Sequence, residues 1–279
     1  MARIAVIGLV GKSMFFEVPR FHTGGETIHA TGFHEEWGGK GFNQAVMAAR
    51  QGASVAFLGA VCASDVKPLK DFCSTEGFRV TLAAKKEATA CAAILTDGTG
   101  ETRVMVHPGA ALSADDVDGF ALMIATADIL LLNNEVPEAV NIAALEIAVK
   151  NKVKVVFNPA PARKLPKTIR DAVSLWTPNE FEESAIGAVA GEVVTTLGAR
   201  GCRIRSTGEI IPAPSVRAVD TTGAGDTFNG VLAVRLAEGD TLVNACRAAN
   251  EAAARSTTVR YVLGAPSSGT RASIDQTVS

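Results

Sequence analysis

The sequence predicts an α/β protein: an open, mainly parallel β-sheet flanked by helices, with a small β-sheet lid. Three features predict it, namely continuous apolar runs, helical patterns between them, and two segments that alternate apolar and polar residues. Continuous apolar runs are typical of strands buried on both faces, and intervening helices provide the crossovers that parallel strands need. The predicted strands are residues 4–7, 55–58, 129–132, 153–157, 173–176 and 193–195.

Helical periodicity separates these runs. A helix from Phe42 carries its apolar residues on one stripe, and Gly52 is a suitable stop after it. A second helix is predicted over about 137–150, a third after Asp226, and a fourth from 242 to about 255. The alternation of strands and helices therefore indicates one open sheet within a single domain, 1–279.

Two segments, about 14–36 and 90–107, interrupt this rhythm with period-two alternation. In the second, an Asp-Gly-Thr-Gly turn at 97–100 lies between the alternating stretches. We expect antiparallel hairpins that protrude from the main sheet as a lid subdomain. An apolar face on such a lid calls for a second subunit to cover it, so the lid is a candidate homodimer interface.

The charge balance excludes several classes of partner. The 279 residues include 27 lysines and arginines and 29 acidic residues, which gives a formal net charge of −2. That balance provides no general field for nucleic acid or an anionic membrane, so any anion must be held by a local site. No apolar stretch approaches the ~20 residues that span a bilayer, and five scattered cysteines favour reduced thiols. We therefore expect a cytoplasmic protein that binds neither nucleic acid nor membrane.

The strongest chemical signal is the glycine-rich segment 220–230. Gly223, Ala224 and Gly225 have little or no side chain, so their N–H groups can approach an anion closely. Apolar residues at helical spacing follow, which places these N–H groups at the positive end of a helix. Asp226 beside this cradle suits a base, ionised at neutral pH, that takes a proton from a hydroxyl attacking phosphorus. The alternative is a glycine-rich turn in which Asp226 only caps the helix.

Polar residues also gather where open α/β sheets bind their ligands, beyond the carboxyl ends of the strands. A second glycine-rich segment, 38–45, brings backbone close to a ligand and lets Lys40 and Asn43 donate to hydroxyls from a first helical turn. The residues that follow predicted strands are Asn133, Asn134, Glu135, Asn158, Asn179, Glu182, Thr196 and Gly198.

Taken together, these segments resemble the ribokinase (PfkB) family of carbohydrate kinases, in the same order and over nearly the whole chain. Several motifs in a fixed order make this resemblance far more specific than a single glycine-rich turn. The matching segments are Gly25-Glu26-Thr27, residues 38–45, His107-Pro108-Gly109-Ala110, Glu135, Asn158-Pro159-Ala160-Pro161-Ala162-Arg163, Thr177-Pro178-Asn179-Glu180, Thr196-Leu197-Gly198-Ala199-Arg200-Gly201 and residues 220–230.

The resemblance implies a kinase that transfers the γ-phosphoryl group of ATP, with Mg²⁺, to a hydroxyl of ribose or a related small sugar. Asp226 is implied as the catalytic base, with Gly223, Ala224 and Gly225 as the anion hole. The implied sugar-binding residues are Gly39, Lys40, Asn43, Glu135 and Asp226.

The resemblance also implies a nucleotide site and two cation sites. The implied nucleotide-binding residues are Asn179, Thr196, Gly198, Gly201 and Asn250. Glu182 completes the family's NxxE motif and is implied in the arrangement of Mg²⁺ and phosphate. Asp220 and Thr222 are implied in a site for an activating monovalent cation, K⁺.

Two departures from the family pattern bear on the activity. Family members carry an Asn-x-Asp motif after the first strand, where this chain has Gly11 and Ser13, so we expect extra room at the acceptor site. The segment after Ile186 is shortened where relatives place a further helix, so we expect part of the sheet to be exposed. Two alternatives stay open: a nucleoside kinase of the same family, and a catalytically weak sugar- or nucleotide-binding regulator on the kinase scaffold.

Overall fold

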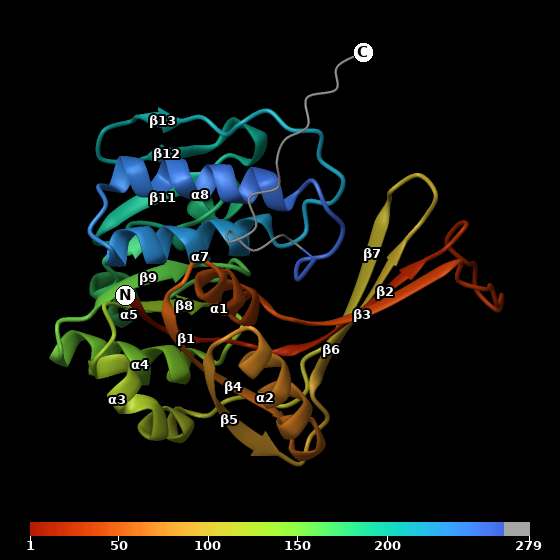
Figure 1. Ribbon diagram of the computed structural model, residues 1–279, viewed down its shortest axis with the longest axis horizontal. Helices are drawn as coiled ribbons and strands as arrows, with labels where there is room; N and C mark the ends of the chain where they lie inside the picture. The colour runs from red at the N-terminus through yellow and green to blue at the C-terminus, as the bar shows by residue number, and fades with distance from the viewer. Residues whose placement is uncertain (265–279) are drawn as a thin grey trace.

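The computed structural model describes residues 1–264, and its main body is a nine-stranded β-sheet with helices on both faces (Figure 1). The strand order is β13-β12-β11-β10-β9-β8-β1-β4-β5. All pairs from β11 to β5 are parallel, and the β11–β12 and β12–β13 pairs are antiparallel, which confirms the predicted fold class. The bounds are β1 (Arg3–Ile7), β4 (Ser54–Cys62), β5 (Arg79–Lys85), β8 (Ile129–Asn133), β9 (Lys154–Asn158), β10 (Leu175–Trp176), β11 (Glu192–Thr196), β12 (Cys202–Ile204) and β13 (Ile210–Ile211).

Two layers of helices cover the sheet, and each layer seals a separate apolar core. One core contains Phe42 and Phe57, whose rings lie 5.5 Å apart, and the other contains Phe157 and Trp176 at 5.0 Å. Each fully buried side chain of this size contributes roughly 1.5–3 kcal/mol to folding. The first layer consists of α1 (Lys40–Arg50), α2 (Val66–Thr75), α7 (Ala224–Ala237) and α8 (Leu242–Ser256), and the second of α3 (Ala121–Ala125), α4 (Glu138–Lys150), α5 (Lys167–Ala172) and α6 (Glu180–Ile186). Short 3₁₀ turns are η1 (Ala63–Asp65), η2 (Ala114–Phe120) and η3 (Gly198–Arg200).

Helix α7 begins earlier than the sequence indicates, and this fixes the place of Asp226. Its N-cap is Gly223, whose φ of 72° lies in the left-handed region that favours glycine, and its first residue is Ala224. The prediction that the helix starts after Asp226 is therefore wrong. Asp226 lies inside the first turn, where the helix dipole favours a carboxylate.

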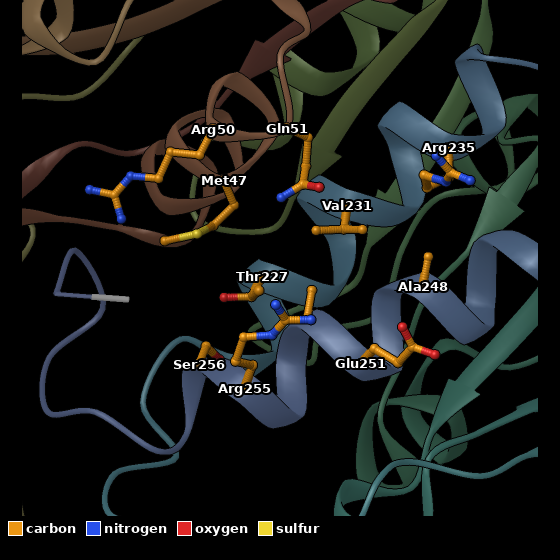
Figure 2. Close-up of a pocket in the computed structure, with 11 residues that line it drawn as sticks. Met47, Arg50, Gln51, Thr227, Val231, Arg235, Ala248, Glu251, Arg255 and Ser256 are labelled. Atoms are coloured by element: carbon orange, nitrogen blue, oxygen red, sulfur yellow. The ribbon is translucent and has the colours of Figure 1, made fainter. Parts of the chain in front are cut away.

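Helices α1 and α7 approach each other closely at Gly230. A Cβ at this position would lie 2.7 Å from the carbonyl oxygen of Gln44 and 2.9 Å from the Cβ of Met47. Figure 2 shows Met47 of α1 beside Thr227 of α7. Because residue 230 has no side chain, the first turns of the two helices can lie close together.

Four strands form a second, smaller sheet that projects from the main body (Figure 1). Its order is β3-β2-β6-β7, and the β2–β3 and β6–β7 pairs are antiparallel as predicted. The two hairpins join through the central pair β2–β6, which is parallel. The reason is that β1 and β5 run in the same direction in the main sheet, and β2 and β6 follow them from the same edge. The bounds are β2 (Gly11–Glu17), β3 (Gly32–Gly38), β6 (Ala90–Thr96) and β7 (Thr102–His107).

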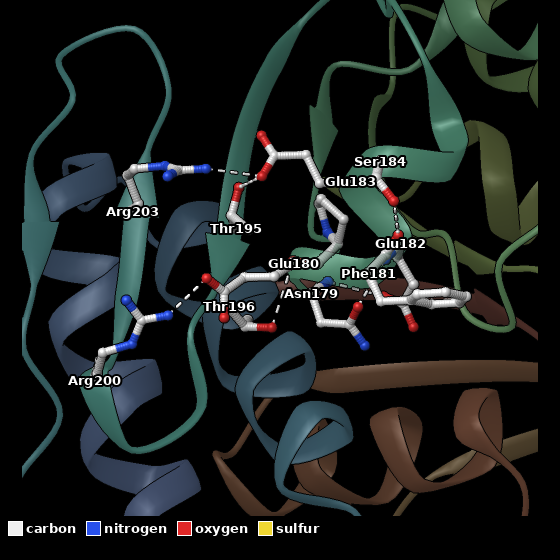
Figure 3. A network of polar contacts seen from close by, with 11 residues as sticks. Asn179, Glu180, Phe181, Glu182, Glu183, Ser184, Thr195, Thr196, Arg200 and Arg203 are labelled. Carbon is white, nitrogen blue, oxygen red and sulfur yellow. Dashed lines mark hydrogen bonds and ion pairs between the residues drawn. The ribbon is translucent and has the colours of Figure 1, made fainter.

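The main sheet is covered at the shortened segment between Ile186 and β11, where the sequence predicts an exposed sheet. Trp176 of β10 is fully buried, and its Nε1 donates to the carbonyl oxygen of Ala190 at 2.9 Å. Glu183 of α6 accepts a hydrogen bond from the buried Thr195 at 2.8 Å and pairs with Arg203 at 2.8 Å (Figure 3). The expected exposure of the sheet is therefore wrong here, because a loop and an ion pair replace the helix.

Candidate active site

Asp226 lies in the first turn of α7, where two amides from α1 hold its carboxylate. Asn43 Nδ2 donates to Oδ2 at 3.0 Å, and Gln44 Nε2 donates to Oδ1 at 3.2 Å. Asp226 is only 7% exposed, so both hydrogen bonds act in a medium that strengthens them. The structure brings Asp226 and Asn43 together. Gln44 is a site residue that the sequence analysis missed, although it lies in the segment 38–45.

The cradle before Asp226 has two free N–H groups rather than three. Within residues 1–264 no hydrogen bond engages the N–H of Gly223 or Gly225, whereas Ala224 donates to the Thr221 carbonyl at 3.3 Å. A Cβ at Gly223 would lie 2.6 Å from Val262, and one at Gly225 would meet nothing within 4 Å. The open space is therefore at Gly225, at the positive end of the helix.

The electrostatics of Asp226 combine opposing effects. Burial raises its pKa above the ordinary value of 3.8, while the charge of Lys40 and the amides of Asn43 and Gln44 lower it. The expected ionisation at neutral pH therefore depends on Lys40 and the two amides, against the cost of burial. A carboxylate with a raised pKa is a better proton acceptor than an exposed one.

Glu135, directly after β8, shares this buried region. Its Oε2 accepts the backbone N–H of Lys40 at 2.6 Å. Gly39, with a φ of 108°, turns the chain into α1, and a Cβ there would lie 2.5 Å from the Leu9 carbonyl oxygen. Burial raises the pKa of Glu135 to about 7, lowered in part by Lys40 and raised further by Asp226. The structure thus groups the predicted residues Gly39, Lys40 and Glu135 with Asp226.

Three buried polar atoms of this region have no partner among the described residues. They are Asn43 Oδ1, Gln44 Oε1 and Asn133 Nδ2. A buried polar atom without a hydrogen bond costs about 1–3 kcal/mol, so these atoms favour a ligand that pairs with them. Two acceptors and one donor match the hydrogen-bonding capacity of hydroxyl groups. The sequence predicts that Asn133 follows a strand, but its place in this region depends on contacts between distant segments.

The positions that depart from the family's Asn-x-Asp motif lie on β2. A Cβ at Gly11 would lie 2.5 Å from the carbonyl oxygen of Ala90 on β6, so backbone fills the space beside it. The Ser13 hydroxyl packs against Gly38, where a Cβ would collide with it. The expectation of extra room at Gly11 is therefore wrong.

The NxxE residues form a helix cap at another part of the sheet edge (Figure 3). Asn179 Oδ1 accepts the N–H of Glu182 at 2.8 Å, and Glu182 Oε2 accepts the N–H of Asn179 at 2.9 Å. Thr196 bridges to Asn179 in parallel register. Gly198 and Gly201 shape the turn that follows β11, with φ values of 59° and 96°. These five residues lie together, in a group separate from Asp226 and its amides.

The remaining predicted site residues have structural partners of their own. Asn250 is buried on α8, and its Nδ2 donates to the carbonyl oxygen of Ile211 at 2.8 Å. Asp220 Oδ1 accepts the N–H of Thr222 at 2.9 Å, and Oδ2 accepts the N–H of Tyr261 at 3.1 Å. Residues 1–264 contain no group of three or more His, Cys, Asp or Glu that could hold a metal ion by themselves.

Comparison with known proteins identifies the class. A profile of the pfkB family carbohydrate kinases matches residues 1–266. The ribokinase of Haemophilus influenzae is 35% identical over 281 residues, which cover 91% of this chain and 92% of that protein. The crystal structure of ribokinase from Thermotoga maritima matches with a TM-score of 0.85 and 30% identity, over 96% of this chain and 97% of that one. Ribokinase from Arabidopsis thaliana, solved with ribose and ATP, matches with a TM-score of 0.81 and 26% identity, over 95% and 96%.

The sheet, its helices and these matches define a phosphotransferase whose acceptor is an alcohol group. The chain belongs to the pfkB family of carbohydrate kinases. The resemblance drawn from the sequence motifs is thereby confirmed.

The raised pKa of Glu135 predicts a pH-dependent loss of stability. The ordinary value is 4.5 and the folded value about 7, so the folded state binds more protons than the unfolded state between them. The free energy of unfolding therefore falls as pH rises through this window, by at most about 3 kcal/mol from this group. Urea unfolding at about pH 5 and about pH 8 should show a smaller fall for Glu135→Gln than for the wild type. Exposed Glu146→Gln on α4 is the control, and an equal fall in all three proteins contradicts the assignment.

Proposed function

We propose that this protein is an ATP-dependent kinase that phosphorylates a hydroxyl of ribose or a closely related sugar, with Asp226 as the general base. The observation that carries the proposal is the buried Asp226 carboxylate at the start of α7, held by Asn43 and Gln44. Similarity over nearly the whole chain to ribokinases, one of them solved with ribose and ATP, supports ribose as the acceptor.

In this reaction Asp226 accepts the proton of the acceptor hydroxyl as that oxygen attacks the γ-phosphorus of ATP. The bond from the sugar oxygen to phosphorus forms while the bond from phosphorus to the β–γ bridging oxygen breaks, which yields the sugar phosphate and ADP. The free N–H groups of Gly223 and Gly225, with that of Ala224, stabilise negative charge on the transferring group. Burial of Asp226 keeps bulk water away, so hydrolysis of ATP is disfavoured.

The sugar site is built from the ends of α1 and β8. Unpaired Asn43 Oδ1 and Gln44 Oε1 accept from sugar hydroxyls, and Asn133 Nδ2 donates to one. Glu135 and Lys40 add a carboxylate and a cation beside them, while Gly39 brings backbone close. The hydrogen-bonding groups of this region favour a small polyol.

The nucleotide and Mg²⁺ belong to the group of residues around Asn179, and K⁺ belongs to the loop before α7. We place ATP on Asn179, Thr196, Gly198, Gly201 and Asn250, along the turn after β11 and the adjoining α8. Glu182 would hold Mg²⁺ through phosphate or water, since only its Oε2 is engaged in the cap, and the ion would neutralise phosphate charge. Asp220 and Thr222 offer the oxygen donors that K⁺ prefers, in a loop directly before the Gly223 cap.

The five cysteines are free thiols, which supports a cytoplasmic enzyme. No helix within residues 1–264 has the length and apolar character to cross a membrane. The near-neutral net charge provides no general field that attracts nucleic acid, so we propose no nucleic-acid partner.

Replacing the proposed base tests the function. Asp226→Asn keeps the shape but cannot accept the proton, so kcat with ribose should fall by about 10²–10⁴-fold. The dissociation constant for ATP should stay within about twofold, because the nucleotide residues lie elsewhere. Exposed Asp118→Asn in η2 is the matched control and should keep wild-type kcat.

The same assay distinguishes the acceptors. A panel of pentoses, hexoses and nucleosides with ATP, Mg²⁺ and K⁺, analysed by product mass, should give ribose phosphate as the main product. Wild-type kcat in Asp226→Asn rejects the base. A nucleoside as the preferred acceptor, or tight sugar binding without any product, rejects the sugar-kinase proposal.

We further propose that the small sheet pairs with the sheet of a second copy. Strand β7 is exposed along its length, and Val104, Met105 and Val106 are 56%, 70% and 67% exposed. An exposed apolar edge strand tends to pair with another chain. A second copy would cover this edge and close the lid over the acceptor.

Sedimentation velocity tests this pairing. The wild type should sediment as a dimer, and Met105→Lys should shift it to the monomer because a charge enters the apolar contact. Leu122→Lys on α3, where the wild-type residue is 67% exposed, is the control and should leave the dimer intact. A monomeric wild type, or a dimeric Met105→Lys, contradicts the proposal.

A further inference from the structure

The outer face of the first helix layer contains a cavity that the proposed reaction does not use. It lies between α1, α7 and α8 and has a volume of about 200 Å³ (Figure 2). It is lined by Gln51 at the end of α1, Thr227 of α7, and Glu251 and Arg255 of α8, with Met47 as part of its apolar wall. The cavity is thus formed by the same two helices that hold Asp226 and its amides.

Four polar side chains of this cavity, those of Gln51, Thr227, Glu251 and Arg255, lack partners within residues 1–264. Thr227 is only 4% exposed, and its Oγ1 has no hydrogen bond. The side chains of Gln51, Glu251 and Arg255 likewise make no hydrogen bond or ion pair with another described residue. A buried hydroxyl without a partner costs free energy, so Thr227 favours a bound molecule, and the more exposed Gln51, Glu251 and Arg255 are free to contact it.

The two other arginines at the cavity are already engaged. Arg50 pairs with Glu76 at 2.7 Å and donates to the carbonyl oxygen of Leu263 at 2.9 Å. Arg235 pairs with Asp240 at 2.7 Å. Arg255 is therefore the guanidinium available to a ligand, and Figure 2 shows it close to Thr227.

We propose that this cavity binds a small organic anion that also carries hydroxyl groups. Arg255, Thr227 and Gln51 donate hydrogen bonds to its oxyanion. Glu251, one helical turn before Arg255 on α8, accepts a hydrogen bond from a hydroxyl of the same ligand. The charge of Glu251 selects against a bare inorganic anion, and the limited volume restricts the ligand to a compact metabolite.

The cavity is adjacent to the catalytic helices. Thr227 follows Asp226 directly on α7, and Met47 lies one turn beyond Asn43 on α1. The two helices are in close contact at Gly230, so the ligand would lie beside the helices that carry Asn43 and Asp226. The inference does not depend on the proposed function, because binding is measured without turnover.

Isothermal titration calorimetry of the full chain, without ATP or sugar, tests the site. The probes are 3-phosphoglycerate and, in a separate arm, L-malate, which distinguish a phosphate from a carboxylate oxyanion. We expect one of them to bind at a single site, and Arg255→Gln to weaken binding by about tenfold or more. Thr227→Val, which keeps the shape of the side chain, should weaken it several-fold. Arg247→Gln, on the same helix outside the cavity, is the matched control and should bind as the wild type does.

Two results overturn the proposal. One is that neither probe binds the wild type at about 10 mM. The other is that Arg255→Gln and Thr227→Val bind as tightly as the wild type, which is also the result expected if the probe occupies the Gly225 cradle. Circular dichroism identifies a variant that has unfolded, and the other variant then decides the outcome.

Discussion

The burial of Asp226 against the first turn of α1 is the constraint on which the rest of the site depends. A carboxylate that is 7% exposed needs compensation, and Asn43 and Gln44 supply a donor to each of its oxygens. Those donors reach it because Gly230 allows α7 to lie directly against α1. Gly223 turns the chain so that Asp226 enters the helix beside free N–H groups. The position of the proposed base and of the free N–H groups beside it is thus set by backbone packing.

A second carboxylate, Glu135, completes the electrostatic picture. Asp226 is buried and Glu135 is partly buried, both have raised pKa values, and Lys40 lowers the pKa of each. Lys40 connects them through its charge, and through its backbone N–H to Glu135. Burial raises the pKa of both acids, and a carboxylate with a raised pKa accepts a proton more readily than an exposed one. The proposed transfer needs such an acceptor within a region that excludes water.

Much of the fold follows from local sequence. Buried parallel strands need continuous apolar runs, so the central strands and the helices around Phe42 and after 137 were predictable. Strand β5, with its half-exposed pattern, and the two-residue β13 carry no such signal. Three other features depend on contacts between distant segments. They are the parallel pairing of β2 with β6, the approach of the Ala90 backbone to Gly11, and the ion pair of Arg203 with Glu183. For the same reason Gln44 could be placed in a motif but not on the Asp226 carboxylate.

The most direct test of the account is a crystal structure of this protein with ribose and a non-hydrolysable ATP analogue. If Asp226 is the base, one ribose hydroxyl lies within about 2.6–3.2 Å of an Asp226 oxygen, with the γ-phosphate analogue on the N–H of Gly225. A ribose hydroxyl that faces the γ-phosphate but hydrogen-bonds to another group, with Asp226 still closed off by Asn43 and Gln44, would contradict it.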